Sequence, residues 1–93
     1  MKGVITMKAV ITVVGKDKTG IIARVSNVLY ENNINILDIS QTIMQDLFTM
    51  IMLVDMSSAS VKEITEKLDT VANEIGVSIH LQNEKLFSSM HRI

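Results

Sequence analysis

The residues best suited to chemistry lie in a polar segment, Gly15-Lys-Asp-Lys-Thr-Gly20, immediately before a stretch of apolar residues at helical spacing. A helix that begins there has unpaired backbone N–H groups and partial positive charge at its N-terminus, which together suit an anion of carboxylate size. Gly20 lets a ligand or a neighbouring backbone approach without a Cβ in the way. Asp17 and the more distant Asn35 offer oxygen acceptors to an ammonium group. The segment is therefore a candidate site for a small charged ligand.

A purely structural role for the same residues is equally consistent with the sequence. Asp17 suits the N-cap position of the helix, where its carboxylate would accept a hydrogen bond from a backbone N–H. Gly20 would then serve only to let the helix pack closely against a strand. From the residues alone, both interpretations stay open.

Hydrophobic periodicity predicts the elements that must position this segment. Runs rich in Val, Ile and Thr with alternating polarity predict strands, and apolar residues three or four apart predict helices. Asn33 and Gly76 are placed to end the two helices, and Ser60 is placed to cap the start of the second. We predict strands over 7–14, 34–43, 47–56 and 77–82, and helices over about 18–32 and 61–75.

This order of elements, β-α-β-β-α-β, predicts an α+β fold of the ferredoxin-like βαββαβ sandwich type. Four antiparallel strands in the order 4-1-3-2 carry both helices on one face. The domain covers 7–83. Residues 1–6 nearly repeat 7–12 and are interpreted as an N-terminal extension, which is either an alternative start or a lengthened first strand. The tail 84–93 is predicted to form a short amphipathic C-terminal helix, because it has apolar residues at helical spacing: Leu86, Phe87, Met90 and Ile93.

The pattern also predicts surfaces that need a partner. Residues 47–56 are apolar on both faces of their strand, so apolar surface remains after the helices pack, and either the tail or a second subunit is expected to cover it. Residues 34–43 are expected at a sheet edge and contain no Pro, Gly or Lys, the residues that commonly protect an edge from pairing. A homodimer is therefore expected.

Composition removes several classes of function. The 93 residues are 47% hydrophobic, carry a formal charge of −1 and contain no cysteine. Disulfides, thiol catalysis and cysteine metal sites are excluded, and neither direct nucleic-acid binding nor membrane attachment is expected. The four methionines in 44–56 sit at strand spacing and are expected in a core or an interface rather than at a metal. We expect no metal, no cofactor and a cytoplasmic location.

Enzymatic activity is not expected either. Nucleophilic catalysis needs a Ser or Thr beside a base, and the chain has two histidines, His80 and His91. His80 is predicted on the face of the sheet away from the helices, where a solvated or packed imidazole is the common case. The carboxylates of the second helix, in 63–69, alternate with lysines and are typical of an ion-paired solvent face.

Three short motifs together resemble a known family. Asp17-Lys-Thr-Gly20-Ile-Ile22 is followed, after one helix, by Asn33-Ile-Asn-Ile36 and Asp38-Ile-Ser-Gln41. In this order and spacing over 7–83, the chain resembles the ACT domain, a ferredoxin-like module that regulates amino-acid metabolism by binding amino acids. It looks most like the small stand-alone ACT proteins, related to the glycine-cleavage regulator type.

The resemblance implies a non-catalytic regulatory domain that binds a small ligand, an amino acid, at the dimer interface and signals through a protein partner. The alternative is a ligand-free interaction and dimerisation module. In the serine-binding members a histidine and an asparagine stand where this chain has Gly15 and Asp17, so the identity of the ligand is open. The residues implied to line the ligand loop are Asp17, Thr19, Gly20 and Ile21, with Asn35 and Ile36 facing it across a subunit interface.

Overall fold

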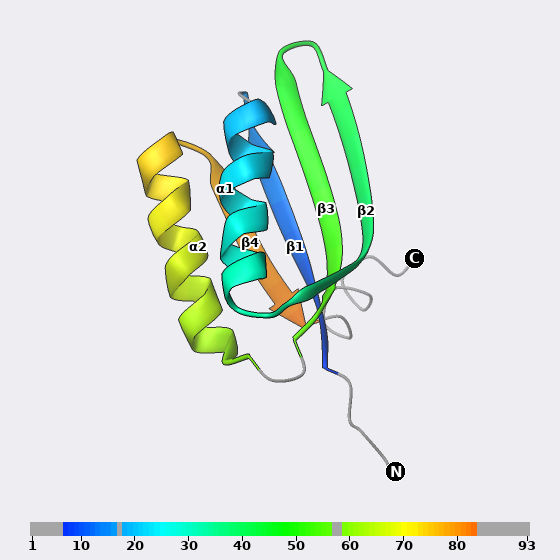
Figure 1. Cartoon of the computed structure of the whole chain (residues 1–93). Helices are drawn as coiled ribbons and strands as arrows, with labels where there is room; N and C mark the ends of the chain where they lie inside the picture. Colours follow the sequence, from blue (N-terminus) through cyan, green and yellow to red (C-terminus); the bar gives the residue numbers. More distant parts are fainter. Residues whose placement is uncertain (1–6, 17, 57–58, 84–93) are drawn as a thin grey trace.

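The computed structural model describes residues 7–16, 18–56 and 59–83 (Figure 1). The four strands and two helices predicted within 7–83 are present, and none of their boundaries differs from the prediction by more than one residue. The predicted N-terminal extension, the C-terminal helix and Asp17 lie outside the described residues. The elements are β1 (Lys8–Gly15), α1 (Lys18–Glu31), β2 (Asn35–Met44), β3 (Leu47–Asp55), α2 (Val61–Ile75) and β4 (Ser78–Asn83).

The four strands form one antiparallel sheet in the order β2-β3-β1-β4. This is the predicted order, 4-1-3-2, counted from the other edge. Both helices lie on the same face of the sheet, and no helix of the described residues covers the opposite face (Figure 1). The predicted ferredoxin-like βαββαβ fold is confirmed.

Local sequence explains where the helices begin and end. The Ser60 hydroxyl accepts a hydrogen bond from the backbone N–H of Glu63 at 3.3 Å, as expected of an N-cap. Gly76 ends α2 in the left-handed conformation at φ 71°. Asn33 follows α1 at φ 56°, the conformation that asparagine tolerates better than most residues. The predicted caps at these three positions are confirmed.

The core lies between the helices and one face of the sheet. On β3 the even-numbered side chains point to the helices and are almost fully buried, and the odd-numbered ones point the other way. Met50, Met52 and Met56 belong to this core, whereas Met44 is 69% exposed beside the β2–β3 turn. The largest core side chains on α1 and α2 are Ile21, Leu29, Ile64 and Leu68.

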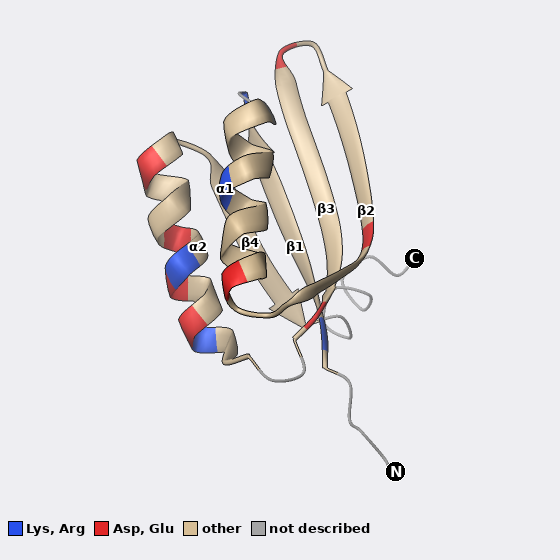
Figure 2. Cartoon of the chain, in the orientation of Figure 1, with Lys and Arg blue, Asp and Glu red and all other residues tan. Residues whose placement is uncertain are grey.

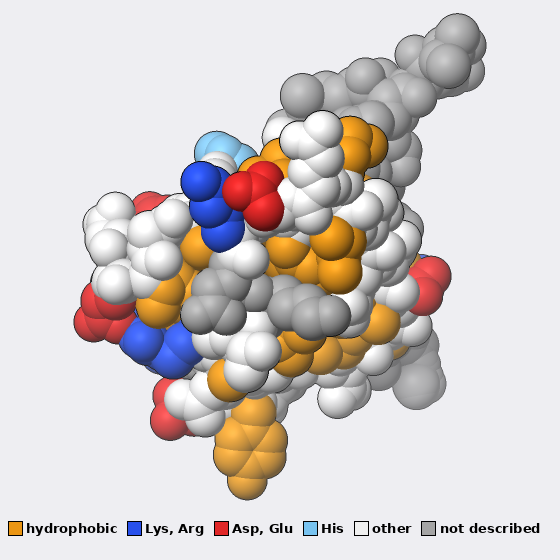
Figure 3. All heavy atoms as spheres, turned by 90° about the horizontal axis from the view of Figure 1, so that it is seen from above, with side chains coloured by type: hydrophobic (Ala, Val, Ile, Leu, Met, Phe, Trp, Pro, Cys, Tyr) orange, Lys and Arg blue, Asp and Glu red, His pale blue; other side chains and the backbone are white. Residues whose placement is uncertain are grey.

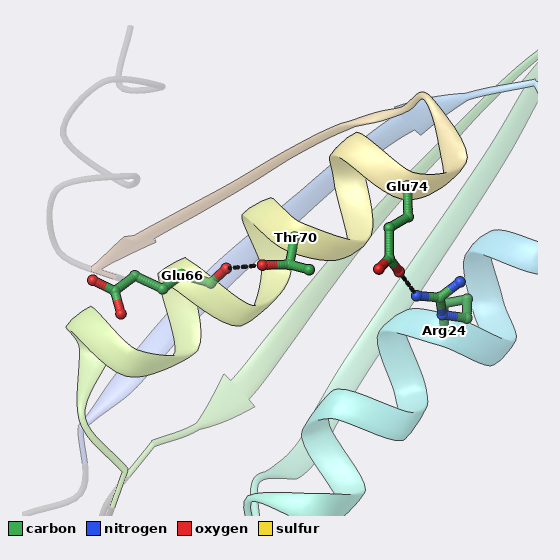
Figure 4. A network of polar contacts seen from close by, with 4 residues as sticks. All are labelled: Arg24, Glu66, Thr70 and Glu74. Atoms are coloured by element: carbon green, nitrogen blue, oxygen red, sulfur yellow. Dashed lines mark hydrogen bonds and ion pairs between the residues drawn. The ribbon is translucent and has the colours of Figure 1, made fainter.

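Polar contacts tie the two helices together on their outer side. Arg24 of α1 forms an ion pair with Glu74 of α2, while Thr70 donates a hydrogen bond to the Glu66 carbonyl within α2 (Figure 4). Both partners of the ion pair are about half exposed, so it contributes at most about 1 kcal/mol. The helices are therefore held mainly by their apolar faces.

Candidate functional site

The candidate loop lies at the end of the sheet where β1 finishes and α1 begins (Figure 1). Strand register fixes this end: Gly15 and Ile43 both lie opposite Phe48. The other end is defined by Asn35 and Lys8, which both lie opposite Asp55. The β2–β3 turn, the last turn of α2 and the start of β4 share the end with the loop (Figure 1).

The predicted ligand residues fall into two groups at opposite ends of α1. Thr19, Gly20 and Ile21 lie in its first turn, and Asn35 begins β2 after its last turn. Fourteen helical residues span about 21 Å, so a single chain does not bring the two groups together. The prediction that they meet across a subunit interface therefore requires a second copy.

Within the first group, the side chains differ in what they offer a ligand. Thr19 is exposed and Gly20 is partly buried. Ile21 is 0% exposed and belongs to the core, where it packs beneath the helix. A ligand at this end would therefore meet the backbone of Ile21 rather than its side chain, together with the surface around Thr19 and Gly20.

The second group lies at the exposed edge of the sheet. Asn35 is opposite Asp55 and faces away from the helices, whereas Ile36 is opposite Val54 on the helix side. Ile36 is 42% exposed despite facing the helix layer. The register then shifts at Leu37, which is an extra residue in β2, a β-bulge.

The absence of a side chain at Gly15 lets the segments at the loop end of the sheet pack closely against each other. A Cβ there would lie 2.4 Å from Val77 Cγ1 and 2.8 Å from Ile21 Cδ1, far inside van der Waals contact. The first turn of α1 and the connection between α2 and β4 therefore meet over this glycine. Position 15 admits no larger side chain without repacking of Val77 and Ile21.

The same end carries a shallow cleft of about 630 Å³. Seen from this end, hydrophobic side chains gather in the middle of the surface (Figure 3). Sequence reasoning missed the contribution of the α2–β4 connection, because its contact with the loop joins parts of the chain that are distant in sequence. The cleft is lined by Val14, Gly15, Lys16, Leu47, Ile75, Gly76, Val77 and Ser78.

Nucleophilic catalysis and metal binding have little support among the described residues. Ser78 Oγ lies 3.1 Å from His80 Nε2, and both residues are exposed on the face away from the helices. No buried residue of 7–16, 18–56 and 59–83 is polar or charged, so no buried carboxylate there orients this imidazole. The same ranges hold no group of three potential metal ligands. None of their helices is long and apolar enough to span a membrane.

Known proteins resemble this chain in both sequence and fold. A UPF0237 protein of Clostridium acetobutylicum is 57% identical over 89 residues, covering 94% of this chain and all of the relative. An ACT domain protein from Streptococcus pneumoniae has 38% identity and a TM-score of 0.77, covering 89% of this chain and 96% of that one.

A larger protein with a related fold is the regulatory subunit of aspartate kinase from Thermus thermophilus. It has 28% identity and a TM-score of 0.64, and the match covers 87% of this chain and 57% of the subunit. The family model described as the ACT domain matches residues 8–82, which cover every helix and strand of the fold except the last residue of β4. The chain therefore belongs to the ACT domain family.

Proposed function

We propose that this protein is a non-catalytic regulator that binds a small amino acid between two copies of the chain and acts through a protein partner. ACT neighbours are regulatory domains, the aspartate kinase subunit among them. The observation that carries the proposal is the separation of the ligand residues to opposite ends of α1. Only a second copy can bring the two groups into one site.

The exposed edge of the sheet supplies a surface for that second copy. All ten residues of β2 are exposed. Its helix-side residues Ile36, Ile39 and Ile43 are 42%, 43% and 57% exposed, because the helices do not reach over this strand. Asp38 is the single charge within the strand, while charged residues gather on α2 (Figure 2). A long edge with a single charge is a template for pairing with another strand.

Antiparallel pairing of two β2 strands would complete the site. In such a pair the start of one strand lies beside the end of the other. Asn35 of the second copy would then lie near Met44 of the first, at the end of the sheet where α1 begins. Symmetry would give each dimer two identical sites.

The groups gathered there match the two charges of an amino acid. Backbone N–H groups in the first turn of α1 favour a carboxylate. Asn35 of the second copy faces away from the helices at the first residue of its strand, so its side chain would reach around the end of the strand for its carbonyl to accept hydrogen bonds from the ammonium group. The apolar surface of Ile36 lies next to it on the helix side. A small amino acid, glycine or serine, fits this arrangement best.

Ligand-induced stabilisation tests the proposal. Each of the twenty amino acids is added at millimolar concentration, and the thermal midpoint is recorded. A ligand at about 100 times its Kd adds about 2.7 kcal/mol per site. Each kcal/mol raises the midpoint of a domain this small by about 4–8 °C. We expect a small polar amino acid to give the largest shift.

Asn35→Ala should abolish that shift while leaving the unliganded midpoint nearly unchanged, because Asn35 is exposed. The matched control is Asn73→Ala, an exposed asparagine on α2, far from the proposed pairing edge, which should keep the full shift. If no amino acid moves the midpoint of a protein that is dimeric by light scattering, the amino-acid proposal is wrong.

That outcome would favour a second candidate, a ligand-free interaction and dimerisation module. The observation behind it is the same apolar edge, since Ile36, Ile39 and Ile43 would be buried by pairing whether or not a ligand is present. A dimer that shows no amino-acid response would support this module and leave the pairing edge in place.

A further inference from the structure

One face of the sheet lies opposite the helices, and its apolar residues gather on the two central strands. On β3 the residues pointing to this face include Leu47, Ile51 and Leu53. Strand register places Val10 opposite Leu53 and Val14 opposite Thr49, so both valines point the same way. We call Val10, Val14, Leu47, Ile51 and Leu53 the open-face stripe.

Burial along the open-face stripe is uneven. Val10 is only 5% exposed, although it points away from the helices and does not belong to the core cluster beneath them. Val14, on the same strand and face, is partly exposed. On β3, Leu53 is partly buried, whereas Leu47 at the other end is 42% exposed. The buried end of the stripe is therefore the end with Val10 and Leu53.

The chain leaves the sheet at that same end. Asn83, the last residue of β4, lies opposite Ala9, and Gln82 lies opposite Val10. Neighbouring strands are about 4.8 Å apart, so Leu53, two strands from Gln82, is about 10 Å away. The next segment, 84–93, carries its apolar residues on one face of a helical pattern: Leu86, Phe87, Met90 and Ile93.

We propose that residues 84–93 dock as an amphipathic helix on the Val10–Leu53 end of the open-face stripe. Helical residues 86–93 would span about 12 Å, enough to cross from β4 to β3. Asp38 lies opposite Leu53 on the same face, and Arg92 gives the segment a charge of the opposite sign. The inference goes beyond the proposed function, because it assigns an occupant to a surface that the amino-acid site does not use.

A double-mutant cycle on the full chain tests the docking. Phe87→Ser and Leu53→Ser are made singly and together, and thermal midpoints are compared. The matched control replaces Leu53→Ser by Leu47→Ser, a leucine on the same strand and face but about 20 Å away. Leu53 and Leu47 are not fully buried, so both variants are expected to fold.

We expect each of the two test changes to lower the midpoint by several degrees, and the double variant to fall no further than the larger single effect. Shifts of Phe87→Ser and Leu47→Ser should add, because those side chains do not meet. Additive shifts in both pairs would overturn the docking. A change in the molar mass of Leu53→Ser by light scattering, with no coupling between Leu53 and Phe87, would also overturn the docking. That result would assign the stripe to a second copy.

Chemical labelling gives a separate readout, because the chain has no cysteine. A thiol introduced as Leu53→Cys should react several-fold faster with a small alkylating reagent when Phe87→Ser is also present. The rate for Leu47→Cys should not change. Equal rates for Leu53→Cys with and without Phe87→Ser would contradict the proposal.

Discussion

At the residue scale, the missing side chain of Gly15 has the largest structural consequence. Its position lets Val77 and Ile21 approach to distances that no Cβ would permit. Through this contact the end of β1, the first turn of α1 and the start of β4 are packed against each other. The candidate loop is thus fixed to the core by a glycine rather than by a polar network.

Gly15→Ala should therefore destabilise the fold by about 1–3 kcal/mol through overpacking. Gly76→Ala is the control, because nothing lies within 4 Å of a Cβ there and its positive φ of 71° is the source of strain. A left-handed conformation costs an L-residue about 1–2 kcal/mol. Urea unfolding measures both. If overpacking is the cause, Gly15→Ala lowers the free energy of unfolding by less in a Val77→Ala background. The loss caused by Gly76→Ala should be the same in both backgrounds. Equal losses for Gly15→Ala in both backgrounds would contradict this explanation.

Some residue-scale features follow from sequence and others do not. Ser60, Asn33 and Gly76 were predictable because capping depends on a few consecutive residues and on one side-chain type. The role of Gly15 was not predictable, because its contact with Val77 joins distant parts of the chain. The full burial of Ile21 also depends on packing, although its helical spacing already indicated the core side.

At the element scale, α2 shows how local signals agree with packing. Its buried residues Ile64, Leu68 and Val71 follow a helical stripe, and the helix begins and ends at the predicted residues. β2 shows the limit of such signals. Alternation alone does not reveal the extra residue at Leu37, which changes which side chains face the helices along the rest of the strand. A bulge is set by pairing with β3, not by β2 itself.

Ser60→Ala should lower the stability of the protein by about 1 kcal/mol, because the backbone N–H of Glu63 loses its acceptor. Chemical denaturation gives the value. Ser60→Asp retains an acceptor and adds a negative charge at the positive end of the helix, so it should match or exceed the parent. A loss for Ser60→Asp equal to that of Ser60→Ala would show that the hydroxyl acts by something other than capping.

At the scale of the whole molecule, the two uncovered surfaces have different proposed occupants. We assign the Val10–Leu53 end of the open-face stripe to residues 84–93 of the same chain, and the β2 edge to a second copy. In the proposed function the edge matters because the predicted ligand residues lie at opposite ends of α1, so pairing and binding would be coupled. The sheet with both helices on one face was predictable from sequence, and a homodimer was already expected from it. The strand register adds that Asn35 and the first turn of α1 lie at opposite ends of the sheet within one chain.

Ile39→Lys tests this coupling. Ile39 lies opposite Met52 near the middle of β2 and is 43% exposed, so a lysine there has room in a single chain. Pairing two copies would bring the two ammonium groups together near the symmetry axis and bury them, which disfavours association. Val61→Lys, at the start of α2 and 36% exposed, is the matched control. Light scattering should give about 10.3 kDa for Ile39→Lys and about twice that for the control.

The folded Ile39→Lys monomer should also lose the amino-acid-dependent shift in its thermal midpoint, because each proposed site takes residues from both copies. A monomer that keeps the shift would place the site within one chain.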